Sequence, residues 1–319
     1  METVTLKCPS SALKKQDRIQ QLKTNCKEWI YCEPISILID LFDNENSMKN
    51  FGEDFESDLK KIQVFSQRWD FRKGKERWDV QDDLFAEKNK NEIRNISLRL
   101  DLTNHVNPSL DPNFILPLGG ARRANYVRPL MASKIIDDQK WCNRTIVALS
   151  GTRPIKDIEK PYIKEYAKGA ETEYEAICYG MEKAFSVNQY SEKKNRSECI
   201  NSQSAIRRYE GCSNNNNLFC LAAPSSEPKI RRANSYDTFN YFLEKFNVRK
   251  GDALLLVTSC IYVPFQLLKF MDLAIENDFD VDCIGADPVD NYSLSNTSNY
   301  LQEIKGTIDA ICMLMDKYK

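Results

Sequence analysis

Apolar and polar residues change their spacing partway along the chain, and this change predicts two regions. In the first part, apolar residues recur at helical intervals in Ser11–Ile30 and Asp54–Arg68, and Ile93–Leu102 fits another short element. Ile35–Phe42 fits either a strand or a helix, because a short apolar run has no decisive period. The pattern therefore predicts a mainly helical N-terminal region over residues 1–110.

Beyond this region, short apolar runs alternate with stretches of helical periodicity. The expected strands are Phe114–Leu118, Thr145–Ser150, Leu218–Ala222, Ala253–Thr258 and Phe279–Ile284. The expected helices are Ala121–Asp137, Thr172–Ser186, Tyr236–Phe246, Pro264–Asn277 and Asn299–Tyr318. This alternation predicts a Rossmann-like α/β domain over residues 111–319, with a parallel sheet of about five strands and helices on both faces. The polar run over residues 188–217 predicts an insertion or a mobile loop.

Composition excludes several classes of protein. The formal charge of −1 supplies no overall attraction to nucleic acid or to an anionic membrane. Apolar runs such as Ile35–Leu41 and Ala253–Val257 are too short to cross a bilayer, and the N-terminus lacks the apolar core of a secretion signal. We therefore expect a cytoplasmic protein with neither nucleic acid nor membrane as a partner.

Cysteine and histidine usage limits the chemistry. The 11 cysteines include no CxxC pair, which favours reduced structural thiols over a zinc site or a disulfide scaffold. The single histidine, His105, lies in a polar connector, so a histidine triad or a histidine-rich metal site is excluded. Acid–base chemistry must come from Asp, Glu, Tyr, Lys or Cys.

The stretch Trp69–Val80 interleaves aromatic and basic residues. This pattern fits a nucleic-acid or phosphate patch. We favour a surface turn or an amphipathic helix whose tryptophans pack inward.

A glycine turn beside arginines predicts a site for a small anionic ligand. Gly119 and Gly120 follow the first expected strand, and Arg122, Arg123 and Asn125 lie in the helix that comes next. Ligands collect at the carboxyl ends of strands in open α/β sheets, where glycines allow close backbone approach. Helix N-termini and arginines both favour phosphate or carboxylate.

Three further strand ends carry polar residues suited to the same site. They are Ser150, Gly151, Thr152 and Arg153; then Thr258 and Ser259, followed by Tyr262; and finally Asp287. Hydroxyls beside an arginine suit an anionic or hydroxylated ligand, and a plain βα turn is the alternative. Tyr262 either donates a hydrogen bond to a ligand or packs at the start of the next helix. Asp287 either binds ribose hydroxyls or acts as a base, or belongs to ordinary turn chemistry before proline.

The acidic segment AETEYEA supplies the expected acid–base group. Thr172 and Glu175 have capping-box spacing, and Glu173 suits the dipole of the first helical turn. Glu171 precedes the cap and is expected to point toward the glycines. It is our candidate for general acid–base catalysis, with a structural role as the alternative.

The order of these motifs resembles the YdcF/SanA/ElyC-like family over roughly Phe114 to Met315. The motifs are LGGARRAN, ALSG, ETEYEA, SYDTFNY and LLLVTSCIYVPFQ. The matching positions are Gly119, Gly120, Arg122 or Arg123, Ser150, Gly151, Glu171, Ser235, Thr238, Thr258 and Ser259. The resemblance implies a shared cleft at the strand ends and says nothing about the N-terminal region.

The chain departs from that family at three positions. Tyr241 stands where the family has Asn, with Asn240 one place early. Tyr262 and Phe265 stand where the family has His and Arg. The last two changes remove a proton carrier and a cation from one edge of the expected site.

Two functions follow as expectations. The first is an enzyme, a transferase or hydrolase, that acts on a small nucleotide-like or phosphorylated metabolite. The alternative is a non-catalytic protein that binds or senses a small molecule with the same fold, and the N-terminal region offers a surface for a protein partner. The sequence names no cofactor, because no GxxxxGK[ST] and no complete GxGxxG follows a strand.

Overall fold

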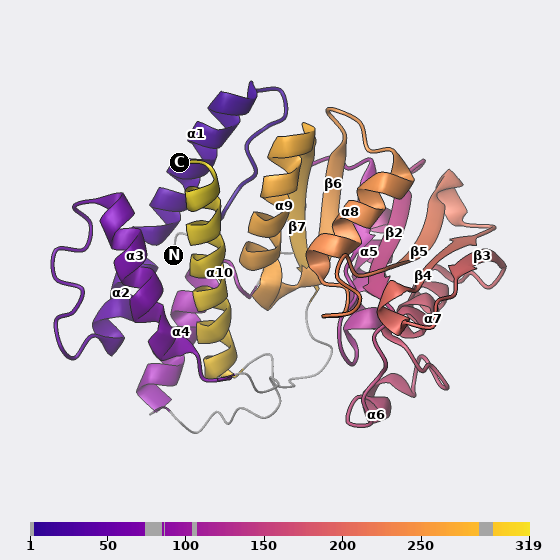
Figure 1. Ribbon diagram of the computed structural model, residues 1–319, viewed down its shortest axis with the longest axis horizontal. Helices are drawn as coiled ribbons and strands as arrows, with labels where there is room; N and C mark the ends of the chain where they lie inside the picture. The colour runs from indigo at the N-terminus through magenta and orange to yellow at the C-terminus, as the bar shows by residue number, and fades with distance from the viewer. Residues whose placement is uncertain (1–2, 74–84, 86, 104–106, 287–295) are drawn as a thin grey trace. The chain divides into compact units, whose positions relative to one another are not determined.

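The computed structural model describes residues 3–73, 85, 87–103, 107–286 and 296–319 (Figure 1). The chain divides into two compact units. The first unit contains Met1–Val106, Cys260–Asp280 and Val289–Lys319, and the second contains Asn107–Ser259 and Val281–Pro288. This division differs from a single boundary at residue 110, because two later segments pack with the N-terminal helices.

The first unit is helical in its described part. Its elements are α1 (Lys15–Ile30), α2 (Glu33–Phe42), α3 (Phe55–Phe65), η1 (Ser66–Trp69), α4 (Glu87–Arg99), η5 (Cys260–Tyr262), α9 (Val263–Asn277) and α10 (Thr297–Lys317). The helical N-terminal region is therefore confirmed, and Ile35–Phe42 is a helix. Helix α10 packs against α3, α4 and α9. Trp69 is fully buried, and the rest of the aromatic and basic stretch lies largely outside the described residues.

A fully buried arginine connects two segments of the first unit that are far apart in the sequence. The guanidinium of Arg18 donates to the carbonyl oxygen of Pro9 at 2.9 and 3.1 Å, to that of Ala274 at 2.9 Å and to that of Phe279 at 2.8 Å. Five fixed donors allow one arginine to satisfy several backbone acceptors at once. Arg18 thereby ties the chain before α1 to the end of α9.

The second unit contains a seven-stranded sheet formed by described residues. The strands are β1 (Phe114–Pro117), β2 (Thr145–Gly151), β3 (Tyr190–Asn195), β4 (Ser204–Tyr209), β5 (Asn217–Ala223), β6 (Ala253–Ser259) and β7 (Asp280–Ala286), in the order β3-β4-β5-β2-β1-β6-β7. Strands β1–β2, β1–β6 and β2–β5 pair in parallel, whereas β3–β4 and β4–β5 pair antiparallel. The α/β class is confirmed, and the expectation of about five parallel strands was wrong.

The two additional strands come from the polar run that predicted an insertion or loop. Their sequences are YSEKKN and SAIRRY; β3 is an exposed edge strand, whereas β4 lies between β3 and β5 and is mostly buried. Arg207 attaches this hairpin to the rest of the unit. Its guanidinium donates to Glu192 in β3 at 3.0 Å and to Glu182 in α7 at 2.7 Å, and it stacks over Tyr190. Where the side chains of a strand form ion pairs, the sequence lacks the alternation of apolar and polar residues that predicts a strand.

Helices cover both faces of the sheet (Figure 1). Ile115, Ile146 and Cys220 face α5 (Ala124–Asp138) and α7 (Glu173–Phe185), whereas Phe114 and Phe219 contact aromatic rings of α8 (Ser235–Phe246). Successive strand residues point to opposite faces, which explains the separation. The short elements are α6 (Lys160–Ile163), η3 (Ile200–Ser202) and η4 (Ser213–Asn215).

Helices α5 and α7 approach closely at Gly180. A Cβ atom at this position would lie 1.8 Å from the carbonyl oxygen of Asn125, a backbone atom that cannot move alone. The crossing therefore requires glycine although glycine weakens helices.

We expect Gly180→Ala to lower the free energy of unfolding by at least about 2 kcal/mol, because overpacking outweighs the gain in helix propensity. Gly306→Ala in α10 is the matched control. Its Cβ would meet nothing nearer than Phe265 at 3.7 Å, so stability should rise by up to about 1 kcal/mol. Chemical denaturation measures both changes, and an equally stable Gly180→Ala protein would contradict the close crossing.

Candidate functional site at the carboxyl edge of the sheet

The parallel strands bring three of the expected polar segments to one edge. Because β1 pairs in parallel with both β2 and β6, their carboxyl ends lie together. Gly119 donates its N–H to the carbonyl oxygen of Leu149 at 2.6 Å, which joins the turn after β1 to strand β2. Arg128 joins the turn after β1 to Ser259 at the end of β6.

The glycine turn is held by its own neighbours. Gly120 donates its N–H to Oδ1 of Asn125 at 2.9 Å, and Nδ2 of Asn125 donates to the carbonyl oxygen of Gly120 at 2.7 Å. Asn125 is buried, so its amide acts as a clamp on the turn. The two glycine N–H groups are thus used inside the protein.

Arg128, which the sequence places in the same helix after the glycine turn, occupies the space beside the turn. Its Nη1 donates to the carbonyl oxygens of Leu118 and Gly119, each at 2.7 Å, and its Nη2 donates to Oγ of Ser259 at 3.2 Å. A Cβ on Gly120 would lie 3.0 Å from this Nη1 and 2.9 Å from Cβ of Ala124. Close packing against a buried guanidinium therefore accounts for the glycine.

The expected anion-binding arginines contact other parts of the protein. Arg122 has a left-handed backbone with a φ of 54°, and its guanidinium stacks 4.4 Å above the ring of Tyr162. Arg123 forms an ion pair with Glu165 at 2.7 Å. Arg153 is shared between two carboxylates.

Arg153 is the centre of a partly buried ion cluster. Its Nη1 and Nη2 donate to the two oxygens of Glu159 at 2.7 and 2.9 Å, and its Nε donates to Oε2 of Glu173 at 2.8 Å. The Glu159 side chain is only 1% exposed. Burial would raise the pKa of Glu159, but hydrogen bonds from Arg153 and from the N–H groups of Lys156 and Arg122 hold that pKa below its usual value.

Glu173 is the carboxylate that faces the glycine turn. It is the first residue of α7, its side chain is 15% exposed, and its Oε1 lies 2.9 Å from the position that a Cβ on Gly119 would take. Burial raises the pKa of Glu173, although Arg153 and Arg232 favour its ionised form. A raised pKa favours the protonated form of a carboxyl group, which general acid catalysis requires.

Glu171, our acid–base candidate from the sequence, lies farther out. It is exposed, its N–H donates to Oε2 of Glu175 at 2.8 Å, and its carbonyl oxygen accepts from the N–H of Ile155. The capping box of Thr172 and Glu175 was the signal for Glu173, because it fixes the residue between them in the first turn of α7.

The hydroxyl residues of the edge differ in their partners. Ser150 and Thr258 are buried. Oγ of Ser150 donates to the carbonyl oxygen of Gly151, and Thr152 donates to that of Ile200 at 2.8 Å. Oγ1 of Thr258 has no hydrogen-bond partner among the described residues.

The other two expected catalytic residues do not belong to the described part of the second unit. Tyr262 is buried in η5, which belongs to the first compact unit. Asp287 lies outside the described residues, as does His105.

The segment before α8 contains an arginine, Arg232, that none of the sequence motifs indicated. Asn234 and Asp237 form a capping box, and Arg231 is paired with Asp237 and Glu227. The adjacent Arg232 is exposed and electrostatically favours the ionised form of Glu173. No hydrogen bond or ion pair of its guanidinium occurs within the described part of the chain.

Two general features concern the described residues alone. They contain no group of three or more His, Cys, Asp or Glu side chains arranged to hold a metal ion. Neither do their helices include one long and apolar enough to cross a membrane.

Comparisons with known proteins place the similarity in a different family from the one that the motifs resembled. Residues 13–101 match the family described as the Rv3785 N-terminal domain. The chain is 24% identical over 293 residues to "Uncharacterized protein Rv3785" of Mycobacterium tuberculosis and to "Uncharacterized protein Mb3814" of Mycobacterium bovis. Each alignment covers 82% of this chain and 81% of the relative. No solved structure matches the chain.

The resemblance to the YdcF/SanA/ElyC-like family was therefore wrong. The similarity found is to Rv3785 proteins, and it includes the N-terminal region that the motifs did not reach. The motifs misled because short glycine and hydroxyl segments suit many turns after parallel strands. Here Gly119 and Gly120 adjoin Arg128 and Asn125 for reasons of packing.

The ion cluster makes a prediction about stability. Arg153→Met leaves the Glu159 carboxylate buried without its cation, so the free energy of unfolding at pH 7 should fall by about 3–5 kcal/mol. Arg123→Met, which breaks the more exposed pair with Glu165, should cost about 1 kcal/mol or less. Urea denaturation of both variants measures the difference, and equal losses would contradict the central position of Arg153.

The lowered pKa of Glu159 also predicts a dependence on pH. The carboxylate stabilises the fold above its unfolded pKa of about 4.3, and this contribution disappears as the pH falls through the lower folded pKa. Glu159→Gln should therefore lose less stability than the wild type on acidification. Thermal melts between pH 7 and pH 3 provide the measurement, and parallel pH profiles would refute the assignment.

Proposed function

We propose that this protein is an enzyme that acts on a small nucleotide-like or phosphorylated metabolite, by group transfer or hydrolysis, at the carboxyl edge of the sheet. Glu173 is the proposed general acid–base. The observation that carries the proposal is the position of this carboxyl group, which lies between the glycine turn and Arg153 with a raised pKa. A carboxyl group whose pKa is raised by burial beside a specific charged partner is a candidate for catalysis.

Arg232 and the start of α8 are the proposed binding groups for the anion. The Asn234 side chain accepts from the N–H of Asp237, which leaves earlier N–H groups of the helix to a ligand. Arg232 is exposed, acts electrostatically on Glu173 and supplies two parallel donors for a phosphate. In this arrangement Arg153 orients Glu173, and Arg232 contacts the substrate.

The alternative function is a binding protein without catalysis. The ion pairs of Arg123 and Arg153 with glutamates favour this alternative, because two of the arginines expected to bind the anion already have carboxylate partners. Both functions need the Arg232 site. Only the enzyme needs Glu173.

The first test is a thermal-shift screen of nucleotides and sugar phosphates, since binding raises the apparent stability. A nucleotide or sugar phosphate that binds at the carboxyl edge should bind Arg232→Gln at least about 10-fold more weakly, because a charge-assisted bidentate contact is lost. Arg249→Gln, which also removes one exposed positive charge, is the control and should bind normally. Equal affinity of all three proteins would refute this anion site.

The second test separates the enzyme from the binding protein. Glu173→Gln should lower turnover of that ligand by about 100-fold or more while binding is retained, whereas Glu171→Gln should remain active. Because burial raises the pKa of Glu173, the wild-type profile of turnover should show a step above the usual carboxyl range that Glu173→Gln lacks. Unchanged turnover in Glu173→Gln would exclude its catalytic role, and retained binding without any turnover would favour the alternative.

A further inference from the structure

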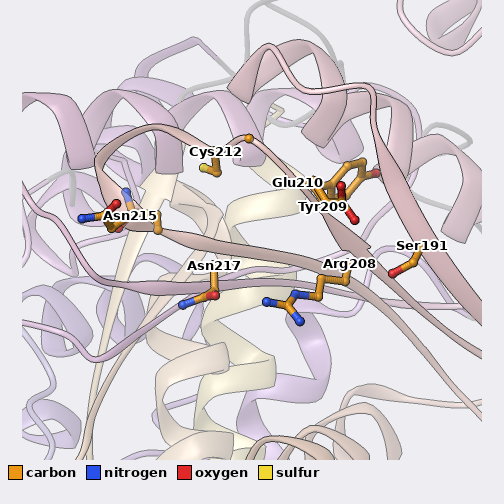
Figure 2. A pocket seen from close by; sticks show the side chains of 9 residues that line it. Ser191, Arg208, Tyr209, Glu210, Cys212, Asn215 and Asn217 are labelled. Carbon is orange, nitrogen blue, oxygen red and sulfur yellow. The ribbon is translucent and has the colours of Figure 1, made fainter.

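A second polar pocket lies at the opposite edge of the sheet. It has a volume of about 520 Å³ and is formed where β4 ends and β5 begins, together with the start of β3 (Figure 2). Asn217 is the first residue of β5, whereas the proposed active edge lies beyond the last residue of that strand. The pocket is therefore separate from the site of the proposed function.

Arg208 is the cation of this pocket, whose lining also includes Glu210. The side chain is exposed, its guanidinium lies 6.0 Å from the centre of the Phe219 ring, and no ion pair or side-chain hydrogen bond engages it in the described part of the chain. The neighbouring Arg207 is fully engaged by Glu182 and Glu192. Because side chains alternate along a strand, Arg207 faces α7 and Arg208 faces the pocket.

Strand pairing places further donors on the same face as Arg208. Ser191 is directly opposite Arg208 on β3, Phe219 is directly opposite it on β5, and Asn217 lies two residues before Phe219. Figure 2 shows the side chains of Ser191, Arg208 and Asn217 on one side of the strand ribbons. Glu210 lies on the other side, near Tyr209. A guanidinium, a hydroxyl and an amide thus share one surface.

The turn that borders the pocket is fixed by backbone contacts. The Asn216 side chain is buried, and its Oδ1 accepts from the N–H of Arg144 at 2.7 Å. Asn214 and Asn215 have left-handed backbones, with φ of 60° and 55°, a conformation that asparagine tolerates. The carbonyl oxygen of Asn214 accepts from the N–H of Asn143 at 3.0 Å. A turn that is already ordered reduces the entropy lost on binding.

We propose that this pocket binds the phosphate group of a small phosphorylated metabolite. Arg208 forms the charge-assisted hydrogen bonds to the phosphate oxygens, and Ser191 and Asn217 donate the remaining ones. The aromatic ring of Phe219 supports the guanidinium from below. The volume exceeds that of a phosphate ion, so the attached group also fits.

Ribose 5-phosphate is a suitable probe, with ribose as the uncharged comparison. We expect ribose 5-phosphate to shift the backbone amide signals of Ser191, Arg208 and Asn217 in NMR spectra of the full chain, and ribose to leave them unchanged. Arg208→Gln should weaken this binding at least about 10-fold. Arg249→Gln removes an equal charge from another exposed position and should bind as the wild type does.

Arg232→Gln distinguishes this pocket from the carboxyl edge. Binding that persists in Arg232→Gln and is lost in Arg208→Gln supports the pocket, whatever the outcome for the proposed enzyme. Binding that is lost in Arg232→Gln and kept in Arg208→Gln overturns the proposal, because it assigns the phosphate to the other edge. Absence of binding, or equal binding of ribose, also overturns it.

Discussion

The guanidinium of Arg153 is the interaction on which the carboxyl edge of the sheet depends. It joins the segment after β2 to Glu159 before α6 and to Glu173 at the start of α7. Glu159 also accepts from the backbone of Arg122, so the turn after β1 is included. A single cation between two poorly solvated carboxylates therefore connects three loops. Removal of any member leaves a charge without its partner, which is far more costly than the loss of an exposed pair.

The same cluster divides the polar residues of this edge by role. Arg153 and Arg123 serve the fold because their charges are balanced inside the protein. Glu173 differs, since only one of its oxygens is held by Arg153 and the other faces the glycine turn. Arg232 differs as well, because its charge has no hydrogen-bonded partner in the described chain. The proposed chemistry of the site therefore rests on Glu173 and Arg232.

Hydrophobic pattern alone predicted much of the fold. The five apolar strands and the principal helices of the second unit were located to within a few residues, because buried parallel strands form continuous apolar runs. Strands β3 and β4 were missed because charged and polar residues dominate their sequences, although Ala205 and Tyr209 of β4 belong to the hydrophobic core. A segment with mainly charged side chains shows no clear hydrophobic period in its sequence. The grouping of α9 and α10 with the N-terminal helices was also invisible, since periodicity describes single elements and not their partners.

The sequence by itself determined the α/β class, the position of the glycine turn and the presence of a single histidine. Only the tertiary structure decided which polar residues form hydrogen bonds and ion pairs inside the protein. Gly119 and Gly120 adjoin Glu173 and Arg128, and Asn125 clamps the turn, because residues distant in the chain meet there. Glu171 and Glu173 differ by two positions, yet one is exposed and the other is buried beside Arg153. The burial and the ion pairs of a side chain depend on the residues that surround it in the fold, and the residue type alone does not predict them.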